Sequence, residues 1–178
     1  MNKTAKVLIA GAGPVGLTAA LLLGSKGIPV VVLEAQDAIS EELRASTFHP
    51  PTLDMMAPYG VTARMMEAGL LCPTWQIRLH PSGDRAVFDL SVLKAETDHP
   101  YRLQCEQSKY CHFVLDAVRK LSSVDLRFGV AVTDIEQSAD AVTVKASSPD
   151  GEQHFTADYV IGADGARSAS VVCGVCAS

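Results

Sequence analysis

The hydrophobic and polar positions at the start of the chain predict a strand, a helix and a second strand. The short, mostly apolar run Lys6–Ala10 is typical of a fully buried strand of a parallel sheet. Leu17–Leu23 is rich in Leu and Ala and long enough for a helix, and Lys26–Pro29 carries the basic, glycine and proline residues that end helices. Val30–Leu33 is again a continuous apolar run. This order predicts a βαβ unit of a parallel sheet.

The middle of the chain departs from this alternation of strand and helix. Apolar and polar residues alternate over Trp75–Leu79, and the turn residues Pro81–Asp84 lead to Ala86–Phe88, which predicts a β-hairpin. Tyr101–Cys105 is expected to form an edge strand. An antiparallel layer is therefore expected to be inserted into the α/β unit. Short helices are expected to begin at Pro50, to span Val61–Ala68 and to begin at Gln107.

The last third of the chain is predicted to consist mostly of strands. Val124–Phe128 predicts a short strand, whereas Ala131–Glu136, Val142–Ala146 and His154–Tyr159 predict an antiparallel meander. Tyr159–Gly162 is apolar again, which indicates a return to a buried parallel strand.

Three glycines separate the first strand from the first helix in G-x-G-x-x-G spacing. Gly11 allows a tight turn, Gly13 lets a pyrophosphate approach the backbone, and Gly16 lets helix and strand pack closely. The helix N-terminus offers N–H groups and the positive end of its dipole to phosphates. Glu34 follows Gly16 by eighteen positions, close to the spacing of about 20 at which an acidic residue meets a ribose hydroxyl. The pattern predicts a dinucleotide site, and both NAD and FAD fit it.

Arg44 is the only basic residue of the polar loop Ile39–Ser46. In a Rossmann-type unit such a loop passes near the glycine turn, so Arg44 could pair with a pyrophosphate. A solvated surface arginine explains the position equally well, and both interpretations stay open on position alone.

Composition and charge narrow the range of partners. The chain has 178 residues, a formal net charge of −5 and no basic run, which argues against a nucleic-acid partner. No uninterrupted apolar run approaches the ~20 residues needed to span a bilayer, so we expect no membrane partner and a cytoplasmic protein. The scattered cysteines, including the CxxC pair Cys173 and Cys176, are expected to be reduced and chemically silent. The histidines lack metal-ligand spacing, so we expect no metal site.

Three motifs together carry a family resemblance. They are Gly11–Leu17 with Glu34, the arginine-led segment Arg44–Leu53, and Tyr159–Ser168 with its Asp-Gly pair. In this order and spacing they resemble the FAD-binding part of class A flavoprotein monooxygenases, the aromatic-ring and polyketide hydroxylases related to para-hydroxybenzoate hydroxylase. The resemblance implies an α/β fold: a Rossmann-like FAD-binding domain of the glutathione-reductase type, with a β-meander and part of an inserted antiparallel substrate-domain layer.

The resemblance implies that the first motif binds the ADP half of FAD. Its glycines would cradle the pyrophosphate, and the acid at the end of the second strand would accept hydrogen bonds from the ribose. The residues expected to contribute are Gly11, Gly13, Pro14, Val15, Gly16, Glu34 and Ala35.

Four further FAD contacts are implied by the resemblance. Arg44 would reach the phosphate and ribityl region, which favours the functional interpretation of this residue, and Gln107 would lie near the ribityl chain. The backbone of Val132 would meet the adenine. Asp164 would contact the ribityl–pyrophosphate linkage, and its motif is also implicated in the use of NAD(P)H. No catalytic residue is identified.

The end of the sequence departs from the family pattern. The arginine expected after the Asp-Gly motif is missing, residues 169–178 form an atypical tail, and the family's third FAD motif and long substrate-binding half do not follow. We therefore expect residues 1–178 to be a truncated FAD-binding domain, in which residues 73–104 are a partial substrate-domain insertion.

The family reaction defines the expected function and its alternatives. NADPH or NADH reduces FAD, O₂ then forms a flavin hydroperoxide, and this species hydroxylates a bound aromatic, usually phenolic, small molecule. We expect this chain to be the FAD-binding portion of such an enzyme, with little or no turnover by itself. The alternatives are an inert or purely nucleotide-binding fragment and an NAD-binding dehydrogenase domain.

Overall fold

The computed structural model describes residues 4–165 of the chain, which divide into two compact units. The first unit contains residues 4–41 and 114–165, and the second contains residues 42–113. The tail 169–178, the CxxC pair and the end of the Asp-Gly motif lie outside the described residues. Within residues 4–165, no helix is long and apolar enough to cross a membrane.

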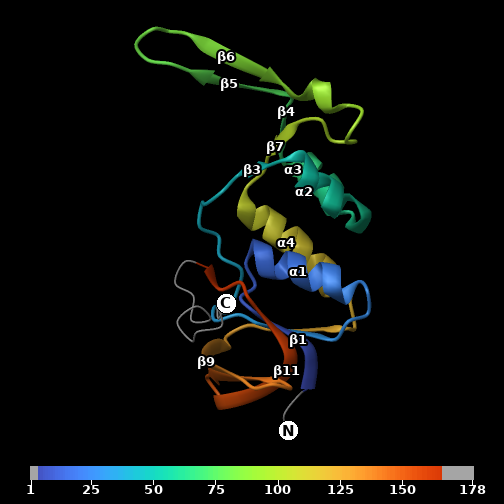
Figure 1. Ribbon diagram of the computed structural model, residues 1–178, viewed down its shortest axis with the longest axis vertical. Helices are drawn as coiled ribbons and strands as arrows, with labels where there is room; N and C mark the ends of the chain where they lie inside the picture. Colours follow the sequence, from blue (N-terminus) through green and yellow to red (C-terminus); the bar gives the residue numbers. More distant parts are fainter. Residues whose placement is uncertain (1–3, 166–178) are drawn as a thin grey trace. The chain divides into compact units, whose positions relative to one another are not determined.

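A six-stranded sheet with the strand order β8-β2-β1-β11-β10-β9 forms the first unit (Figure 1). Strand β1 pairs in parallel with β2 and β11, and β2 pairs in parallel with β8. Strand β10 pairs antiparallel with β9 and β11, so the predicted parallel sheet and meander are both confirmed. The elements are β1 (Thr4–Ala10), α1 (Pro14–Gly24), β2 (Val30–Leu33), β8 (Val124–Arg127), β9 (Ala131–Gln137), β10 (Val142–Ser148) and β11 (Gly151–Gly162).

Strand β11 belongs to both halves of this sheet. Its first part pairs antiparallel with β10 as far as Ala157, and its last part, from Thr156, pairs in parallel with β1. The sequence predicted two strands that meet at Tyr159, but the structure has one strand of 12 residues. The parallel pairing continues to Gly162 opposite Ala10, so the carboxyl ends of β11 and β1 lie side by side.

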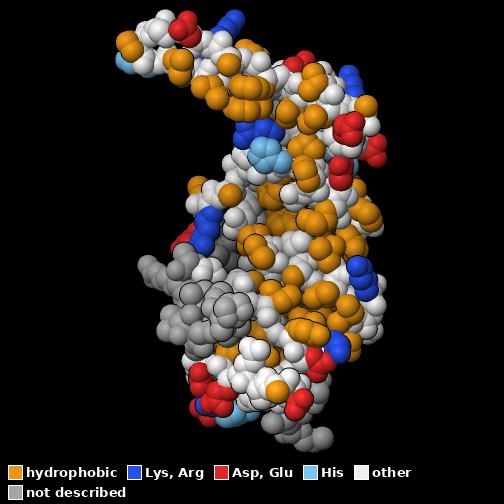
Figure 2. Space-filling model, viewed as in Figure 1, with side chains coloured by type: hydrophobic (Ala, Val, Ile, Leu, Met, Phe, Trp, Pro, Cys, Tyr) orange, Lys and Arg blue, Asp and Glu red, His pale blue; other side chains and the backbone are white. Residues whose placement is uncertain are grey.

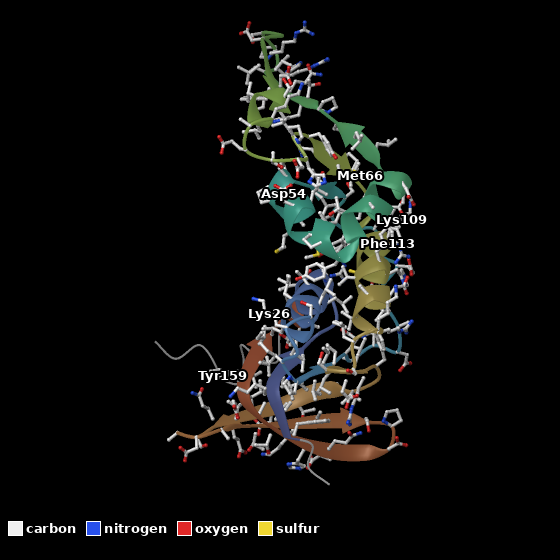
Figure 3. The ribbon with its side chains drawn as sticks, turned by 90° about the vertical axis from the view of Figure 1, so that its right-hand side faces the viewer. Lys26, Asp54, Met66, Lys109, Phe113 and Tyr159 are labelled. Atoms are coloured by element: carbon white, nitrogen blue, oxygen red, sulfur yellow. The ribbon has the colours of Figure 1, made fainter. Side chains whose placement is uncertain are left out.

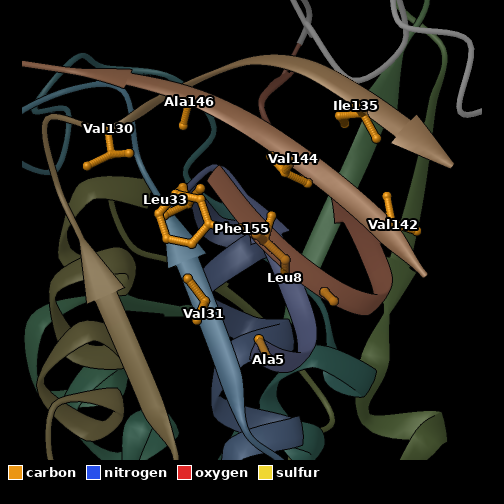
Figure 4. Packing of buried hydrophobic residues seen from close by; sticks show 11 residues of the cluster. Ala5, Leu8, Val31, Leu33, Val130, Ile135, Val142, Val144, Ala146 and Phe155 are labelled. Atoms are coloured by element: carbon orange, nitrogen blue, oxygen red, sulfur yellow. The ribbon is translucent and has the colours of Figure 1, made fainter. Parts of the chain in front are cut away.

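A cluster of buried apolar side chains joins the parallel strands to the meander (Figure 4). Leu8 and Val144 are fully buried, and Phe155 is 2% exposed. Leu33, the last residue of β2, belongs to the same cluster. Because burying one large apolar side chain contributes about 1.5–3 kcal/mol, the cluster holds the end of β2, and the Glu34 that follows, in a fixed position.

The second unit contains two small antiparallel sheets and short helices. One sheet has the order β3-β7-β4, and the other is the hairpin β5-β6. Helix α4 (Gln107–Val118) begins in this unit and ends in the first. The other elements are β3 (Thr47–Phe48), α2 (Pro50–Met56), the 3-10 helix η1 (Ala57–Tyr59), α3 (Val61–Ala68), β4 (Leu70–Cys72), β5 (Thr74–Arg78), β6 (Arg85–Asp89), the 3-10 helix η2 (Leu90–Leu93) and β7 (Arg102–Gln104).

The expectation that Tyr101–Cys105 forms an edge strand was wrong. Strand β7 is the central strand of its sheet, because Gln104 pairs with Thr47 of β3 on one side and with Leu70 of β4 on the other. Both neighbours have only two or three residues. Strands that short carry no readable alternation of apolar and polar residues.

The hairpin predicted around residues 75–88 is confirmed. Trp75 of β5 stacks on Phe88 of β6, with ring centroids 4.2 Å apart. All five residues of β6 are exposed, and many apolar side chains lie on the surface of this part of the unit (Figure 2). The large exposed apolar residues here are Leu70, Leu71, Ile77, Leu79, Val87, Phe88 and Val92.

An aspartate of α2 holds the loop that precedes β7 (Figure 3 labels Asp54). The Thr97 hydroxyl donates to the Asp54 carboxylate at 2.7 Å, and His99 Nδ1 lies 2.6 Å from Asp54 Oδ1. The His99 N–H donates to Thr97 Oγ1 at 2.9 Å, which closes the network. The hydrogen bonds from His99 and Thr97 hold the pKa of Asp54 below its ordinary value of 3.8.

We expect Asp54→Asn to lower the stability of the second unit at neutral pH. A depressed pKa in the folded state stabilises the fold above the ordinary value of 3.8, and this stabilisation is lost as the pH falls through the lower folded value. The difference between the variant and the wild type should therefore shrink on acidification below about pH 4. Denaturation followed by the fluorescence of Trp75, the single tryptophan of the chain, reports on this unit. The control is Asp98→Asn, an exposed change in the same loop. If the stability difference between Asp54→Asn and the wild type did not depend on pH, the stabilising role given to the ionised Asp54 would be contradicted.

Candidate functional site

Two of the three loop glycines are required by packing. Gly11 has a φ of +101°, and a Cβ atom there would lie 2.4 Å from the carbonyl oxygen of Ala163. A Cβ atom at Gly16 would lie 1.9 Å from the carbonyl oxygen of Gly11. Any side chain at either position would collide with backbone. The turn therefore folds tightly onto the start of α1 and onto the end of β11.

Gly13 differs from its two neighbours in the motif. It has a φ of −73°, which any residue adopts, and a Cβ atom there would meet nothing within 4 Å. Gly13 is the N-cap of α1, where no side chain makes a capping hydrogen bond and Pro14 occupies the first turn. The first-turn N–H groups of a helix have no partner within the helix, and the dipole makes this end positive. The open space in front of Gly13 can therefore admit an anionic group, with Val15 65% exposed beside it.

Glu34 connects the end of β2 to this loop. Its Oε2 accepts a hydrogen bond from the Ala12 N–H at 2.6 Å, and its Oε1 accepts one from the Gln36 N–H at 2.9 Å. The residue is half-buried, and Ala35 after it is exposed. A carboxylate has about four acceptor positions, so lone pairs remain for two hydroxyl donors. The spacing in the sequence predicted an acid near the loop, but it gave no sign of these two backbone contacts.

The Asp-Gly motif reaches the same edge of the sheet. The Ala163 N–H donates to the carbonyl oxygen of Ala10 at 2.8 Å, which extends the pairing of β11 with β1 by one residue. Asp164, half-buried, follows directly. The Cα atom of Asp164 would lie 2.9 Å from a Cβ atom on Gly11. The glycine loop, Glu34 and Asp164 thus meet at the carboxyl ends of three neighbouring parallel strands, where ligands bind in open α/β sheets.

Residues that the sequence reasoning did not single out support Glu34 from the other side. The carbonyl oxygen of Glu34 accepts from the Val130 N–H at 2.8 Å, and that of Gln36 accepts from the Gly129 N–H at 2.9 Å. Gly129 has a φ of +69°. A glycine between two predicted strands was the available signal for this turn.

Three further expected residues are on other elements. Val132 is on β9, opposite Ala146, and packs against the apolar cluster of the first unit. Arg44 belongs to the second unit, where it is exposed and its guanidinium lies 2.8 Å from Glu42 Oε2. Gln107 begins α4 in the second unit, and its N–H donates to the carbonyl oxygen of Ala45 at 3.0 Å.

The sheet order and the glycine loop define a Rossmann-like dinucleotide-binding domain with an antiparallel meander after the parallel strands. Residues 4–173 match the FAD binding domain family, and the chain belongs to this family. The resemblance to FAD-dependent aromatic hydroxylases is therefore confirmed.

Similar proteins support this membership. The chain is 36% identical over 163 residues to para-nitrophenol 4-monooxygenase of Pseudomonas sp. (strain WBC-3). The aligned region covers 91% of this chain and 40% of that protein. It is 34% identical to 6-hydroxy-3-succinoylpyridine 3-monooxygenase HspB of Pseudomonas putida (strain DSM 28022 / S16), over 94% of this chain and 43% of that protein. The chain thus spans about 40% of the length of these relatives.

Solved structures of a monooxygenase and a hydroxylase are also similar to this chain. The p-nitrophenol 4-monooxygenase PnpA of Pseudomonas putida DLL-E4 has a TM-score of 0.87 and 36% identity, over 98% of this chain and 44% of that chain. An aklavinone-11 hydroxylase in a ternary complex with FAD and aklavinone has a TM-score of 0.77 and 27% identity, over 94% of this chain and 34% of that chain.

The packing predicts a large loss of stability for one glycine-to-alanine substitution and a small loss for another. We expect Gly16→Ala to lower the free energy of unfolding by about 3 kcal/mol or more, because the new Cβ atom collides with the Gly11 carbonyl. Gly13→Ala should cost no more than about 1 kcal/mol, the difference between glycine and alanine at an N-cap. Urea unfolding followed by far-UV circular dichroism measures both values. If both variants lost the same free energy of unfolding, the conclusion that packing requires Gly16 but not Gly13 would be contradicted.

Proposed function

We propose that this chain is the FAD-binding portion of a NAD(P)H-dependent monooxygenase that hydroxylates an aromatic or phenolic small molecule. The observation that carries the proposal is the open N-cap at Gly13, which lies between two glycines that packing requires and beside the Glu34 carboxylate. The chain's family and the names of its relatives, which are aromatic and pyridine monooxygenases, favour FAD over NAD as the ligand of this site.

The glycine loop would hold the ADP half of FAD. The pyrophosphate would sit in front of Gly13, where the N-terminus of α1 supplies N–H donors and a positive dipole. Pro14 and Val15 would form the rim of this cradle. Glu34 would accept hydrogen bonds from the ribose hydroxyls with its remaining lone pairs, while the Ala12 and Gln36 N–H groups keep the carboxylate oriented.

The other expected contacts complete the proposed site. Asp164, next to Gly11, would accept a hydrogen bond from the ribityl hydroxyl nearest the pyrophosphate. The backbone of Val132 would face the adenine. We assign Arg44 to the phosphates and Gln107 to the ribityl chain. Arg44 would have to exchange its exposed Glu42 partner for a phosphate, and such a surface ion pair costs no more than about 1 kcal/mol to break.

The chemistry of the proposed reaction belongs to the cofactor. Bound FAD, reduced by NADPH or NADH, would activate O₂ for hydroxylation of the substrate. The protein residues named above bind and orient FAD, and none of them transfers a proton in this proposal. We assign residues 73–104 to an inserted substrate-domain layer, and the location we propose is the cytoplasm.

FAD binding tests the proposal. We expect the purified chain to retain flavin absorbance after desalting, and Gly13→Ala to weaken FAD binding at least about tenfold, because the new methyl group enters the space of the pyrophosphate. Glu34→Gln should also weaken binding, because an amide that turns its NH₂ group toward Ala12 or Gln36 loses an acceptor.

Glu152→Gln, an exposed change in the same unit, is the control and should bind FAD like the wild type. Fluorescence quenching of titrated FAD measures all of these affinities. A colourless protein that binds NAD in place of FAD would contradict the proposal and favour a dehydrogenase domain. Equal FAD affinities of the wild type and a folded Gly13→Ala variant would place the cofactor elsewhere.

A further inference from the structure

The second unit contains a cavity of about 470 Å³ that the proposed FAD chemistry does not use. It is an open pocket along α3, on which Figure 3 labels Met66, and His99 of the loop before β7 is part of its lining. Three of its six lining residues have apolar side chains. The lining residues are Ala57, Thr62, Ala63, Met66, Glu67 and His99.

Asp54 determines which nitrogen of His99 can serve a ligand. His99 Nδ1 lies 2.6 Å from the Asp54 carboxylate, so in the neutral ring the proton is on Nδ1 and is donated to Asp54. Nε2 is then an acceptor. It has no hydrogen-bond partner among residues 4–165. An aspartate behind a histidine in this way fixes both the tautomer and the orientation of the ring.

The other polar side chains of the lining are acceptors as well. The Thr62 hydroxyl donates its hydrogen bond to the Leu53 carbonyl oxygen at 2.5 Å, so towards a ligand it can only accept. Met66 Sδ already accepts from the Tyr101 hydroxyl at 3.3 Å, and burial raises the pKa of this phenol, which keeps its proton. The side chain of the exposed Glu67 makes no hydrogen bond or ion pair within the described part of the chain.

The one charged residue of the cavity lining within the described part of the chain is the acidic Glu67, and Asp54 stands directly behind His99. The arginine of the same helix, Arg64, is placed over the Phe113 ring, with its guanidinium carbon 4.3 Å from the ring centroid. Among residues 4–165, no lysine or arginine lines the cavity. The surroundings therefore favour a cation that donates hydrogen bonds.

We propose that this cavity binds an organic ammonium ion carried on a small apolar body. The ammonium group would donate to the Glu67 carboxylate and to His99 Nε2, and the apolar body would lie against Ala57, Ala63 and the Met66 side chain. An ammonium has three donors and no acceptor, which matches a lining whose polar side chains only accept. None of the residues that line this cavity is assigned to the proposed FAD site.

A series of three probes of equal size tests the proposal on the wild-type chain. Benzylamine, benzyl alcohol and benzoate are titrated separately into the ¹⁵N-labelled protein in the same buffer. We expect benzylamine to bind with a Kd on the order of millimolar, about three- to fivefold more tightly than benzyl alcohol, with benzoate weakest. The amide signals of Ala57, Ala63 and Glu67 should shift. Equal binding of the amine and the alcohol, or shifts confined to other residues, would overturn the proposal.

A matched pair of variants separates this site from general surface charge. Glu67→Gln keeps the shape of the side chain and removes its charge, so it should abolish the preference for the amine over the alcohol. Glu96→Gln removes an exposed charge of the same unit outside the lining and should leave the preference intact. FAD affinity is measured on both variants and should equal that of the wild type. An unchanged preference in Glu67→Gln would refute the assignment, whatever the result for FAD.

Discussion

The backbone contact between the glycine loop and the end of β11 is the constraint on which the proposed FAD site depends. The carbonyl oxygens of Ala163 and Gly11 occupy the places where side chains of Gly11 and Gly16 would be. Because these contacts are backbone to backbone, a shift of neighbouring side chains cannot relieve a collision there. The contact brings the ends of β1 and β11 together with the N-terminus of α1. The apolar cluster that contains Leu33 adds the end of β2 to the same edge.

One motif therefore contains positions with different physical roles. Gly11 and Gly16 are needed whether or not a ligand is bound, whereas Gly13 has open space in front of it and an ordinary backbone conformation. Glu34 also has two roles, because the carboxylate that is proposed to bind ribose already orders the loop through the Ala12 N–H. A ligand at this edge would meet a loop that is ordered before binding, which reduces the entropy lost on association.

Local patterns in the sequence predicted the elements that depend on local physics. The bounds of β2, the hairpin around Trp75 and the order of the meander were correct, because continuous or alternating apolar runs decide these features. The central place of β7 and the double pairing of β11 depend on partners far along the chain, and they were missed. The contact of Glu34 with Ala12 was missed for the same reason. The spacing in the sequence predicted that Glu34 lies near the glycine loop. Which N–H group donates to its carboxylate depends on the tertiary structure.

What stabilises the hairpin β5-β6 of the second unit is a separate physical question. A two-stranded hairpin alone is marginally stable in water, and here Trp75 of one strand stacks on Phe88 of the other. Its residues nevertheless include Ile77, Val87 and Phe88, which are 47%, 58% and 41% exposed. A concentration of exposed apolar surface of this kind marks an interaction site in a folded protein. Apolar side chains on an antiparallel hairpin are stabilising when a further layer covers them, and this hairpin belongs to residues 73–104, which we propose to be part of a substrate-domain layer.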